Sequence, residues 1–171
     1  MGSTAHSGAV DQSRFVALLE PVLPRASRLA RVMLDGRPEA EDAVQEAVVS
    51  AWRHIGSYEA GRPIEAWFLA IVANQCRMHR RNKWWSVIKL GRSRDEAVSG
   101  GQPSAAVTDL RLALRRMPHD QRLVLALRYY IDLPFDAIGQ TLGISRDAAK
   151  SRTSRALKRL RIEIPKELGD D

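Results

Sequence analysis

The residues best suited to binding a ligand are basic and cluster near the end of the chain. Between 146 and 161, wound at 3.6 residues per turn, one arc is basic and small and the opposite arc is apolar. Arg and Lys bind guanine O6 and N7 or phosphates, and a helix about 10–12 Å wide fits the major groove. The alternative is a solvated basic face of a small helical bundle. The predicted DNA contacts are Arg146, Lys150, Ser151, Arg152, Ser154, Arg155 and Lys158.

A second row of side chains is suited to unpaired DNA. Trp67, Ala70, Asn74, Arg77 and Arg81 follow one another at spacings of three and four, so they share one side of a helix. An aromatic ring stacks on a base, an Asn amide pairs with a base edge and Arg binds phosphate. The alternative is that the tryptophan belongs to the core and that the arginines complement the helix dipole.

An acidic strip follows a third predicted helix. Asp42, Gln45 and Glu46, with Ser50 and Arg53, lie opposite its apolar face. Carboxylates repel DNA, so in a chain of net charge +7 this strip predicts a basic protein partner. The alternative is an ordinary solvated face.

No group of residues in the sequence predicts catalysis. The four histidines, His6, His54, His79 and His119, are scattered without metal-ligand spacing, and there is no Gly-rich phosphate loop or Ser/His pairing. Cys76 is the only cysteine, which excludes an intrachain disulfide and a multi-thiolate zinc site. We therefore expect a protein that is not an enzyme and has no cofactor or metal.

Two short helices joined by a tight turn are predicted to position the basic face. Pro134 suits the start of the first helix, Gly143 its left-handed end, and Ser145 the N-cap of the second. This pattern is typical of a helix-turn-helix. The apolar positions that should face inward are Phe135, Ile138, Leu142, Ala149, Thr153, Ala156, Leu157 and Leu160.

The rest of the chain also has helical periodicity and shows no strand pattern. Pro21 and Pro24 should break or kink the helical pattern of 11–33, and further helices are expected over 38–55, 63–85, 107–117 and 123–130. The sequence therefore predicts an all-α protein with two small helical domains. Their expected extents are 11–85 and 105–171, after a disordered tail at 1–10 and on either side of a flexible linker at 86–104.

Composition restricts the partner and the compartment. A net charge of +7 and an isoelectric point near 10.2 over 171 residues point to a polyanionic partner, with nucleic acid as the first candidate. Charged residues make up 27% of the chain and leave no apolar run long enough for a membrane span. The first residues lack a signal-peptide pattern. We expect a cytoplasmic protein without membrane insertion.

Three segments, in order, resemble the sigma-70 superfamily of bacterial RNA polymerase sigma factors, specifically its extracytoplasmic-function (ECF) group. They are AEDAVQEAVVSAW at 40–52 and AWFLAIVANQCRMHRR at 66–81, which are similar to region 2, and the stretch 113–161, which is similar to region 4. The resemblance implies a factor that binds core polymerase and directs it to promoters with minus-ten and minus-thirty-five elements. It also implies an anti-sigma factor as a further partner.

The resemblance assigns roles to particular residues. Asp42, Gln45 and Glu46 would dock on the clamp of the largest polymerase subunit, and region 4 would meet the flap of the second-largest. The row of Trp67, Asn74, Arg77 and Arg81, with Tyr58 in the preceding loop, would bind the minus-ten element as its strands part. Lys150, Ser151, Ser154 and Arg155 match positions that read the minus-thirty-five element.

The chain departs from the family pattern at several positions. Asp147-Ala148-Ala149 replaces the usual G-T-V, Ile138-Gly139 replaces I-A, and Met78 stands where an acidic residue is common. Promoter preference therefore does not transfer from relatives. The alternative function is a stand-alone helix-turn-helix regulator, which leaves the acidic strip and the row containing Trp67 and Asn74 without a role.

Overall fold

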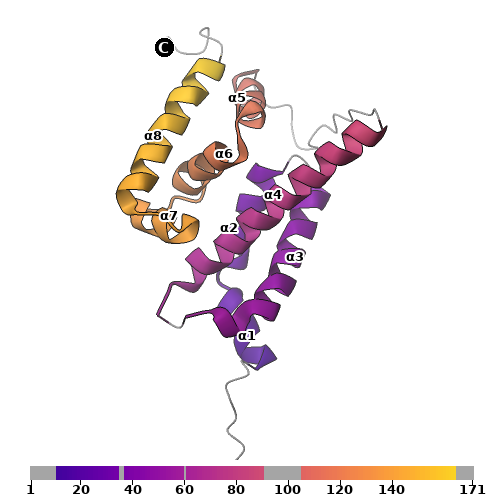
Figure 1. Cartoon of the computed structure of the whole chain (residues 1–171), viewed down its shortest axis with the longest axis vertical. Helices are drawn as coiled ribbons and strands as arrows, with labels where there is room; N and C mark the ends of the chain where they lie inside the picture. Colours follow the sequence, from indigo (N-terminus) through magenta and orange to yellow (C-terminus); the bar gives the residue numbers. More distant parts are fainter. Residues whose placement is uncertain (1–10, 35–36, 60, 91–104, 165–171) are drawn as a thin grey trace, which may run out of the picture.

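The computed structural model describes residues 11–34, 37–59, 61–90 and 105–164, and within these ranges the chain is helical and contains no strand (Figure 1). The predicted tail at 1–10 lies outside them. The helices are α1 (Gln12–Leu19), α2 (Leu23–Met33), α3 (Arg37–His54), the 3-10 turn η1 (Ile55–Ser57), α4 (Ile64–Leu90), α5 (Ala105–Arg116), α6 (His119–Leu125), the π-helical turn η2 (Ala126–Tyr130), α7 (Phe135–Leu142) and α8 (Arg146–Glu163).

The prolines near the start of the chain separate α1 from α2, as predicted. α1 ends at Leu19, and Pro24 lies in the first turn of α2. A proline is tolerated there because the backbone N–H that it lacks would have no partner inside the helix. The break lets α1 and α2 pack on the other helices at different angles (Figure 1).

α3 and α4 form the centre of the first half. Ala40, Ala43, Ala47 and Ala51 are buried at spacings of three and four, and these small side chains let α3 lie close to α2 and α4. The apolar face expected on this helix is buried at the alanines, whereas Trp52 on the same helix is 43% exposed. Its ring lies at the rim of the bundle, 5.0 Å from the Phe15 ring in an edge-to-face contact.

α4 is longer than the sequence pattern predicted. It ends at Leu90, so it continues through the first five residues of the predicted linker at 86–104. Apolar periodicity weakens after Trp85, but no Gly or Pro occurs between Pro63 and Gly91 to stop the helix. Residues 91–104 lie outside the described ranges, and the domain bounds stay a prediction.

The second half contains a widened turn that the sequence did not predict. In η2 the backbone N–H of Ile131 donates to the carbonyl of Ala126, five residues earlier, at 2.9 Å. The widening shifts the helical register, so Tyr130, three residues after the buried Leu127, is 50% exposed while Ile131 and Leu133 are buried. α7 and α8 then form the predicted helix-turn-helix, in which α8 packs on α6 and α7 contacts η2.

The two halves also pack against each other. α4 contacts α7, and α2 contacts α6 and η2, so one side of the first half is covered by the second (Figure 1). The buried apolar residues of both halves form a single cluster. In the described ranges, every helix is too short or too polar to cross a membrane.

Candidate functional site

The turn of the helix-turn-helix is built as the sequence predicted. Gly143 ends α7 with a φ of 65°, the left-handed conformation that favours glycine, and the backbone N–H of Ile144 donates to the Gly139 carbonyl at 2.9 Å. Ser145 is the N-cap of α8, where its hydroxyl accepts from the Ala148 N–H at 3.1 Å. These bonds fix the angle at which α8 leaves α7.

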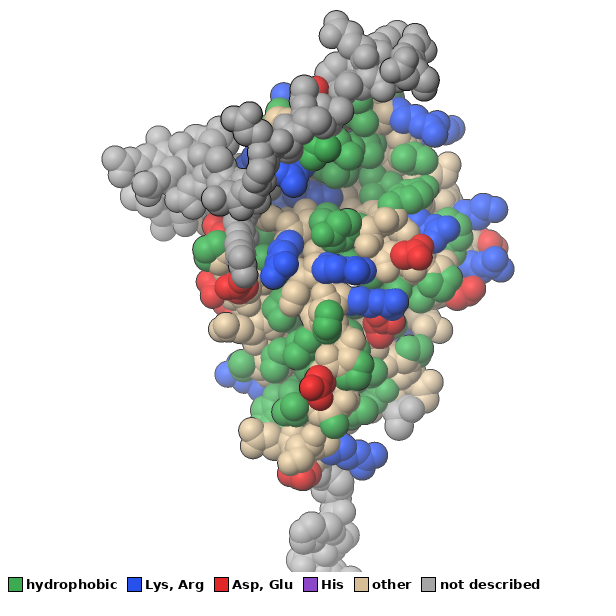
Figure 2. Space-filling view, turned by 180° about the vertical axis from the view of Figure 1, so that it is seen from behind, with side chains coloured by type: hydrophobic (Ala, Val, Ile, Leu, Met, Phe, Trp, Pro, Cys, Tyr) green, Lys and Arg blue, Asp and Glu red, His purple; other side chains and the backbone are tan. Residues whose placement is uncertain are grey.

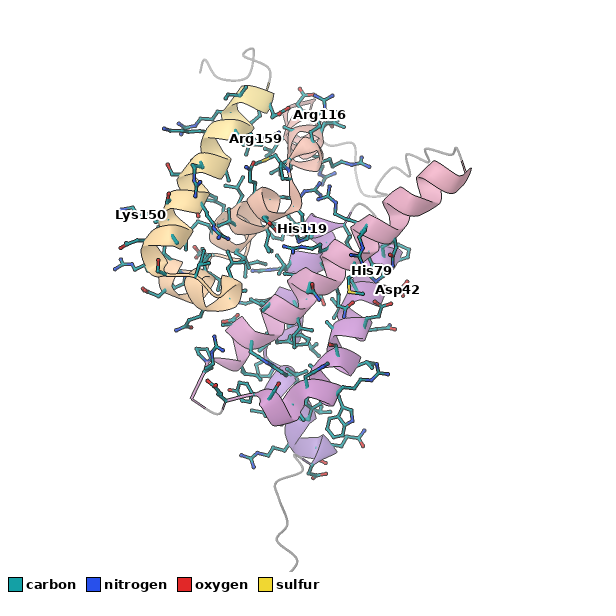
Figure 3. All side chains as sticks on the ribbon, viewed as in Figure 1. Asp42, His79, Arg116, His119, Lys150 and Arg159 are labelled. Carbon is teal, nitrogen blue, oxygen red and sulfur yellow. The ribbon has the colours of Figure 1, made fainter. Side chains whose placement is uncertain are left out.

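α8 divides into the two predicted faces. Ala149, Thr153, Ala156 and Leu160 are buried, and the Thr153 hydroxyl donates to the Ala149 carbonyl. Lys150 projects outward in Figure 3, and from behind several Lys and Arg side chains line the edge that α8 occupies (Figure 2). All seven residues predicted to bind the minus-thirty-five element are exposed: Arg146, Lys150, Ser151, Arg152, Ser154, Arg155 and Lys158.

Two of these side chains make contacts on their own domain. The Arg155 Nε donates to the Ser151 carbonyl at 3.4 Å, so its guanidinium lies back along α8. Arg146 lies 3.7 Å from the carboxylate of Asp136 on α7. Both contacts are solvent-exposed and weak, so they leave the basic face available to a polyanion.

Trp67 is half-buried. Its ring lies 5.2 Å from the ring of Tyr58, whose hydroxyl donates to the Arg62 carbonyl at 2.6 Å. Tyr58 lies in the loop before α4 and Trp67 lies on α4, and both were predicted to bind the separated DNA strand. The structure therefore brings these two rings together. A cavity of about 260 Å³ lies beside Trp67 and Ala70, and its other wall is lined by Leu142 and Gly143 of the second half.

The remaining members of the predicted row, Asn74, Arg77 and Arg81, are exposed on α4. The Asn74 amide nitrogen lies 4.0 Å from the Met78 sulfur, a weak contact that leaves most of its bonding capacity unused. Arg77 forms an ion pair with Asp120 of α6. Thus two members of the row, Trp67 and Arg77, meet the second half of the same chain.

The acidic strip on α3 is exposed as predicted, and it is not purely polar. The Glu46 carboxylate lies 3.0 Å from Nε2 of His79 on α4, a histidine that sequence analysis treated as uninvolved. Val49 is 48% exposed and follows Gln45 and Glu46 by four and three residues, so it lies within the strip. That spacing was readable from the sequence but was missed. An exposed apolar side chain among polar ones suits a protein interface.

The junction between the halves uses residues to which sequence analysis gave no role. Arg122 is only 2% exposed, and its guanidinium donates to the Met33 carbonyl at 3.3 Å and to the Arg115 carbonyl at 2.9 Å. Arg28 of α2 donates to the Tyr130 carbonyl at 3.4 Å and lies 5.8 Å above the Tyr130 ring. No local sequence pattern signals the two contacts between the halves, because Arg122 and Met33 are 89 residues apart and Arg28 and Tyr130 are 102 residues apart.

Two groups near α4 have strongly shifted pKa values. Burial raises the pKa of the Cys76 thiol to about 12, partly offset by a backbone hydrogen bond, so the thiol stays neutral and serves as a small apolar core residue. Burial, with repulsion from Arg77, Arg80 and Arg122 and an opposing attraction from Asp120, lowers the pKa of His119 to about 4. In the part of the chain that the structure describes, no group of acidic, His and Cys side chains could hold a metal ion.

Comparison with known families matches both halves of the chain. The family described as Sigma-70 region 2 matches residues 18–86, and that described as Sigma-70, region 4 matches residues 113–161. The first match covers the acidic strip and the α4 row. The second covers α6, η2, the helix-turn-helix and most of α8.

Several characterised proteins are similar over most of their length. The ECF RNA polymerase sigma factor SigM of Mycobacterium tuberculosis is 33% identical over 137 residues, which cover 78% of this chain and 68% of SigM. ShbA of Streptomyces griseus, also an ECF RNA polymerase sigma factor, is 32% identical over 146 residues, covering 79% of this chain and 76% of ShbA.

Solved structures share the fold. The sigma factor RpoE of Bartonella quintana, in complex with the anti-sigma factor NepR, superposes with a TM-score of 0.70 and 26% identity, covering 91% of this chain and 98% of RpoE. CnrH, solved in complex with the cytosolic domain of CnrY, superposes with a TM-score of 0.64 at 20% identity, covering 90% of this chain and 88% of CnrH, a likeness of fold alone.

Proposed function

This chain belongs to the ECF group of sigma-70 RNA polymerase sigma factors, and from that premise we propose which of its surfaces bind polymerase and promoter DNA. As a sigma factor it binds core RNA polymerase and directs transcription initiation at promoters, and it is not an enzyme. The observation that carries the assignment is the occurrence of both regions, in family order, on the two helical halves. Its site of action is the cytoplasm.

The helix-turn-helix binds the minus-thirty-five element. All seven predicted contact residues are exposed on or beside one face of α8, and the turn bonds at Ser145 and Gly143 fix the angle between this helix and α7. Arg and Lys on that face reach base edges and phosphates of the major groove. Binding should therefore weaken steeply with salt, because each neutralised phosphate releases counterions.

The row on α4 binds the minus-ten element once its strands separate. Tyr58 and Trp67 supply two adjacent rings for stacking, Asn74 has free hydrogen-bonding capacity, and Arg77 and Arg81 supply positive charge. Stacking of one base on an aromatic ring is worth about 1–3 kcal/mol, enough to offset the unstacking of a flipped base.

The strip on α3 binds the polymerase clamp. Asp42, Gln45 and Glu46 offer a polar, partly acidic face, with Val49 exposed within it and Trp52 exposed beside it. Such a mixture of charge and apolar surface is common at protein interfaces. The second half would contact the flap, and the two tethered sites raise each other's effective concentration. Because RpoE is solved with an anti-sigma factor, we extend that kind of partner to this chain as well.

Run-off transcription tests the function itself. Purified core polymerase is incubated with a pool of genomic fragments from the source of this chain, with and without the protein. New transcripts with defined start sites are expected only when the protein is present. DNA binding without transcripts and without co-elution with core polymerase would instead identify a stand-alone helix-turn-helix regulator.

A substitution on α4 tests the role of the row. Asn74→Ala should reduce promoter opening, measured by permanganate reactivity of unpaired thymines, while binding of a duplex upstream element stays unchanged. Gln75→Ala, which removes the neighbouring amide on a different side of α4, is the matched control. An equal loss in opening and in duplex binding would refute the assignment of Asn74 to the separated strand.

A further inference from the structure

The second half of the chain covers part of the row on α4. Arg77 is paired with Asp120 of α6, and the cavity beside Trp67 is closed by Leu142 and Gly143. A DNA strand that stacks on Trp67 and binds Arg77 would have to displace the second half from these two positions, whereas Asn74 and Arg81 are already exposed. The strip on α3 is exposed in the same arrangement, so polymerase can reach it without separating the halves.

His119 lies between α6 and α4 at this junction (Figure 3). Both ring nitrogens are shielded from solvent and have no hydrogen-bond partner in the described part of the chain, and the same holds for Nη1 of Arg80 on α4. An aromatic nitrogen that is buried and unpartnered is a costly arrangement, which any change that releases it would relieve.

The charges around His119 oppose its protonation. Arg77 and Arg80 act from α4, and Arg122 acts from its own helix, while Asp120 is the attractive charge. The groups that α2 and α5 present to Arg122 are neutral, because the Met33 and Arg115 carbonyls accept hydrogen bonds from its guanidinium. A proton on His119 would thus add a fourth cation to a partly buried cluster that contains one carboxylate.

We propose that protonation of His119 separates the two halves and thereby frees the part of the minus-ten row on α4 that the second half contacts, at Trp67 and Arg77. In the closed arrangement the imidazole must stay neutral. In the open one it reaches water, takes up a proton and no longer faces the arginines of α4. The consequence for DNA rests on the proposed role of the row, whereas the closure itself does not.

The size of the effect follows from proton linkage. The pKa of His119 is lowered from 6.5 to about 4 in the closed arrangement and should return to its ordinary value on opening. Closure is therefore fully stable above pH 6.5 and is progressively lost as the pH falls toward 4. Between pH 8 and pH 5 the ratio of open to closed molecules should rise about 30-fold.

A cysteine at the junction can measure this opening without DNA or polymerase. Ala66 is buried and lines the cavity shared by α4 and α7, so in an Ala66→Cys variant the new thiol reacts quickly only after opening. Labelling with 4,4′-dithiodipyridine is followed at pH 8 and pH 5, with and without His119→Gln. At each pH the labelling rate with His119 present is divided by the rate with His119→Gln, which cancels the ionisation of the thiol. This ratio should rise about 30-fold from pH 8 to pH 5.

Three controls separate opening from other events. His79→Gln removes a histidine on the α3 side of α4 and should keep the full response. Arg80→Gln removes one cation that repels a proton on His119, so it should reduce the rise in the rate ratio between pH 8 and pH 5. A purely structural role for His119 would not explain such a reduction. Cys76, buried in the first half, reports global unfolding, and the ratio of its labelling rates with and without His119→Gln should be the same at both pH values.

The proposal fails if the rate ratio is the same at pH 8 and pH 5. It also fails if Cys76 becomes reactive in parallel, since that would show unfolding instead of separation, or if Arg80→Gln keeps the full response. Because no nucleic acid is present, none of these outcomes bears on whether the chain is a sigma factor.

Discussion

The buried guanidinium of Arg122 offers a sharp test of what holds the two halves together. It donates to the Met33 carbonyl in the last turn of α2 and to the Arg115 carbonyl in the last turn of α5, so one side chain caps two helix ends. In Arg122→Lys the buried charge is kept, but a compact ammonium lacks the planar fork that serves both carbonyls at once. Loss of one charged hydrogen bond should cost about 2–3 kcal/mol.

Urea unfolding followed by far-UV circular dichroism at pH 7 measures this cost. The expected loss corresponds to a fall in Tm of about 4–12 °C for a chain of this size. Arg116→Lys makes the same chemical change at an exposed position of α5 (Figure 3) and should alter the free energy of unfolding by less than about 0.5 kcal/mol. If Arg122→Lys is as stable as Arg116→Lys, the two-carbonyl geometry contributes nothing and the reasoning is wrong.

Two further predictions concern the helix-turn-helix. Arg155→Ala should weaken binding of the upstream element by about 1–3 kcal/mol and relax its sequence preference, whereas Arg161→Ala, on the same helix but outside the predicted contact set, should leave the preference unchanged in gel-shift competition. Gly139→Ala should lower the free energy of unfolding by about 1 kcal/mol, since overpacking outweighs the gain in helix propensity. A Cβ at Gly139 would lie 2.7 Å from the Ile144 carbonyl, whereas the Cβ of a control Gly56→Ala meets nothing within 4 Å, so equal stability of the two variants would contradict this account.

The closed arrangement bears on the order of events at a promoter. A ligand shifts such an equilibrium only by its differential affinity for the open and closed forms. Polymerase bound to the exposed strip on α3 need not favour either form, whereas an unpaired strand on the α4 row requires the open one. Binding of the strand must therefore supply the free energy that opening requires. Protonation of His119 lowers that free energy, so less of it has to come from the strand.

The glycine at 139 shows how a departure from the family pattern acquires a physical meaning. From the sequence, Ile138-Gly139 was a small change from the usual I-A. In the structure the α carbon of Gly139 faces the backbone of the turn so closely that a methyl group would collide with the Ile144 carbonyl. The turn between α7 and α8 is correspondingly tight, which links this substitution to the orientation of the recognition helix.

The sequence by itself determined the features that depend on neighbours along the chain. Helical periodicity, the proline break after α1, the Gly143 end and the Ser145 cap predicted the helices and the helix-turn-helix, because caps and periodic burial involve residues within a few positions of one another. The exposed basic face of α8 followed from the same 3.6-residue period.

Only the tertiary structure decided how the two halves meet. The contacts of Arg122 with Met33, of Arg28 with Tyr130 and of Arg77 with Asp120 join residues far apart in the sequence. The π-helical turn η2 left Tyr130 50% exposed, three residues after the buried Leu127. Such features depend on the simultaneous packing of several helices, which no local pattern encodes, and for that reason His119 was indistinguishable in the sequence from any surface histidine.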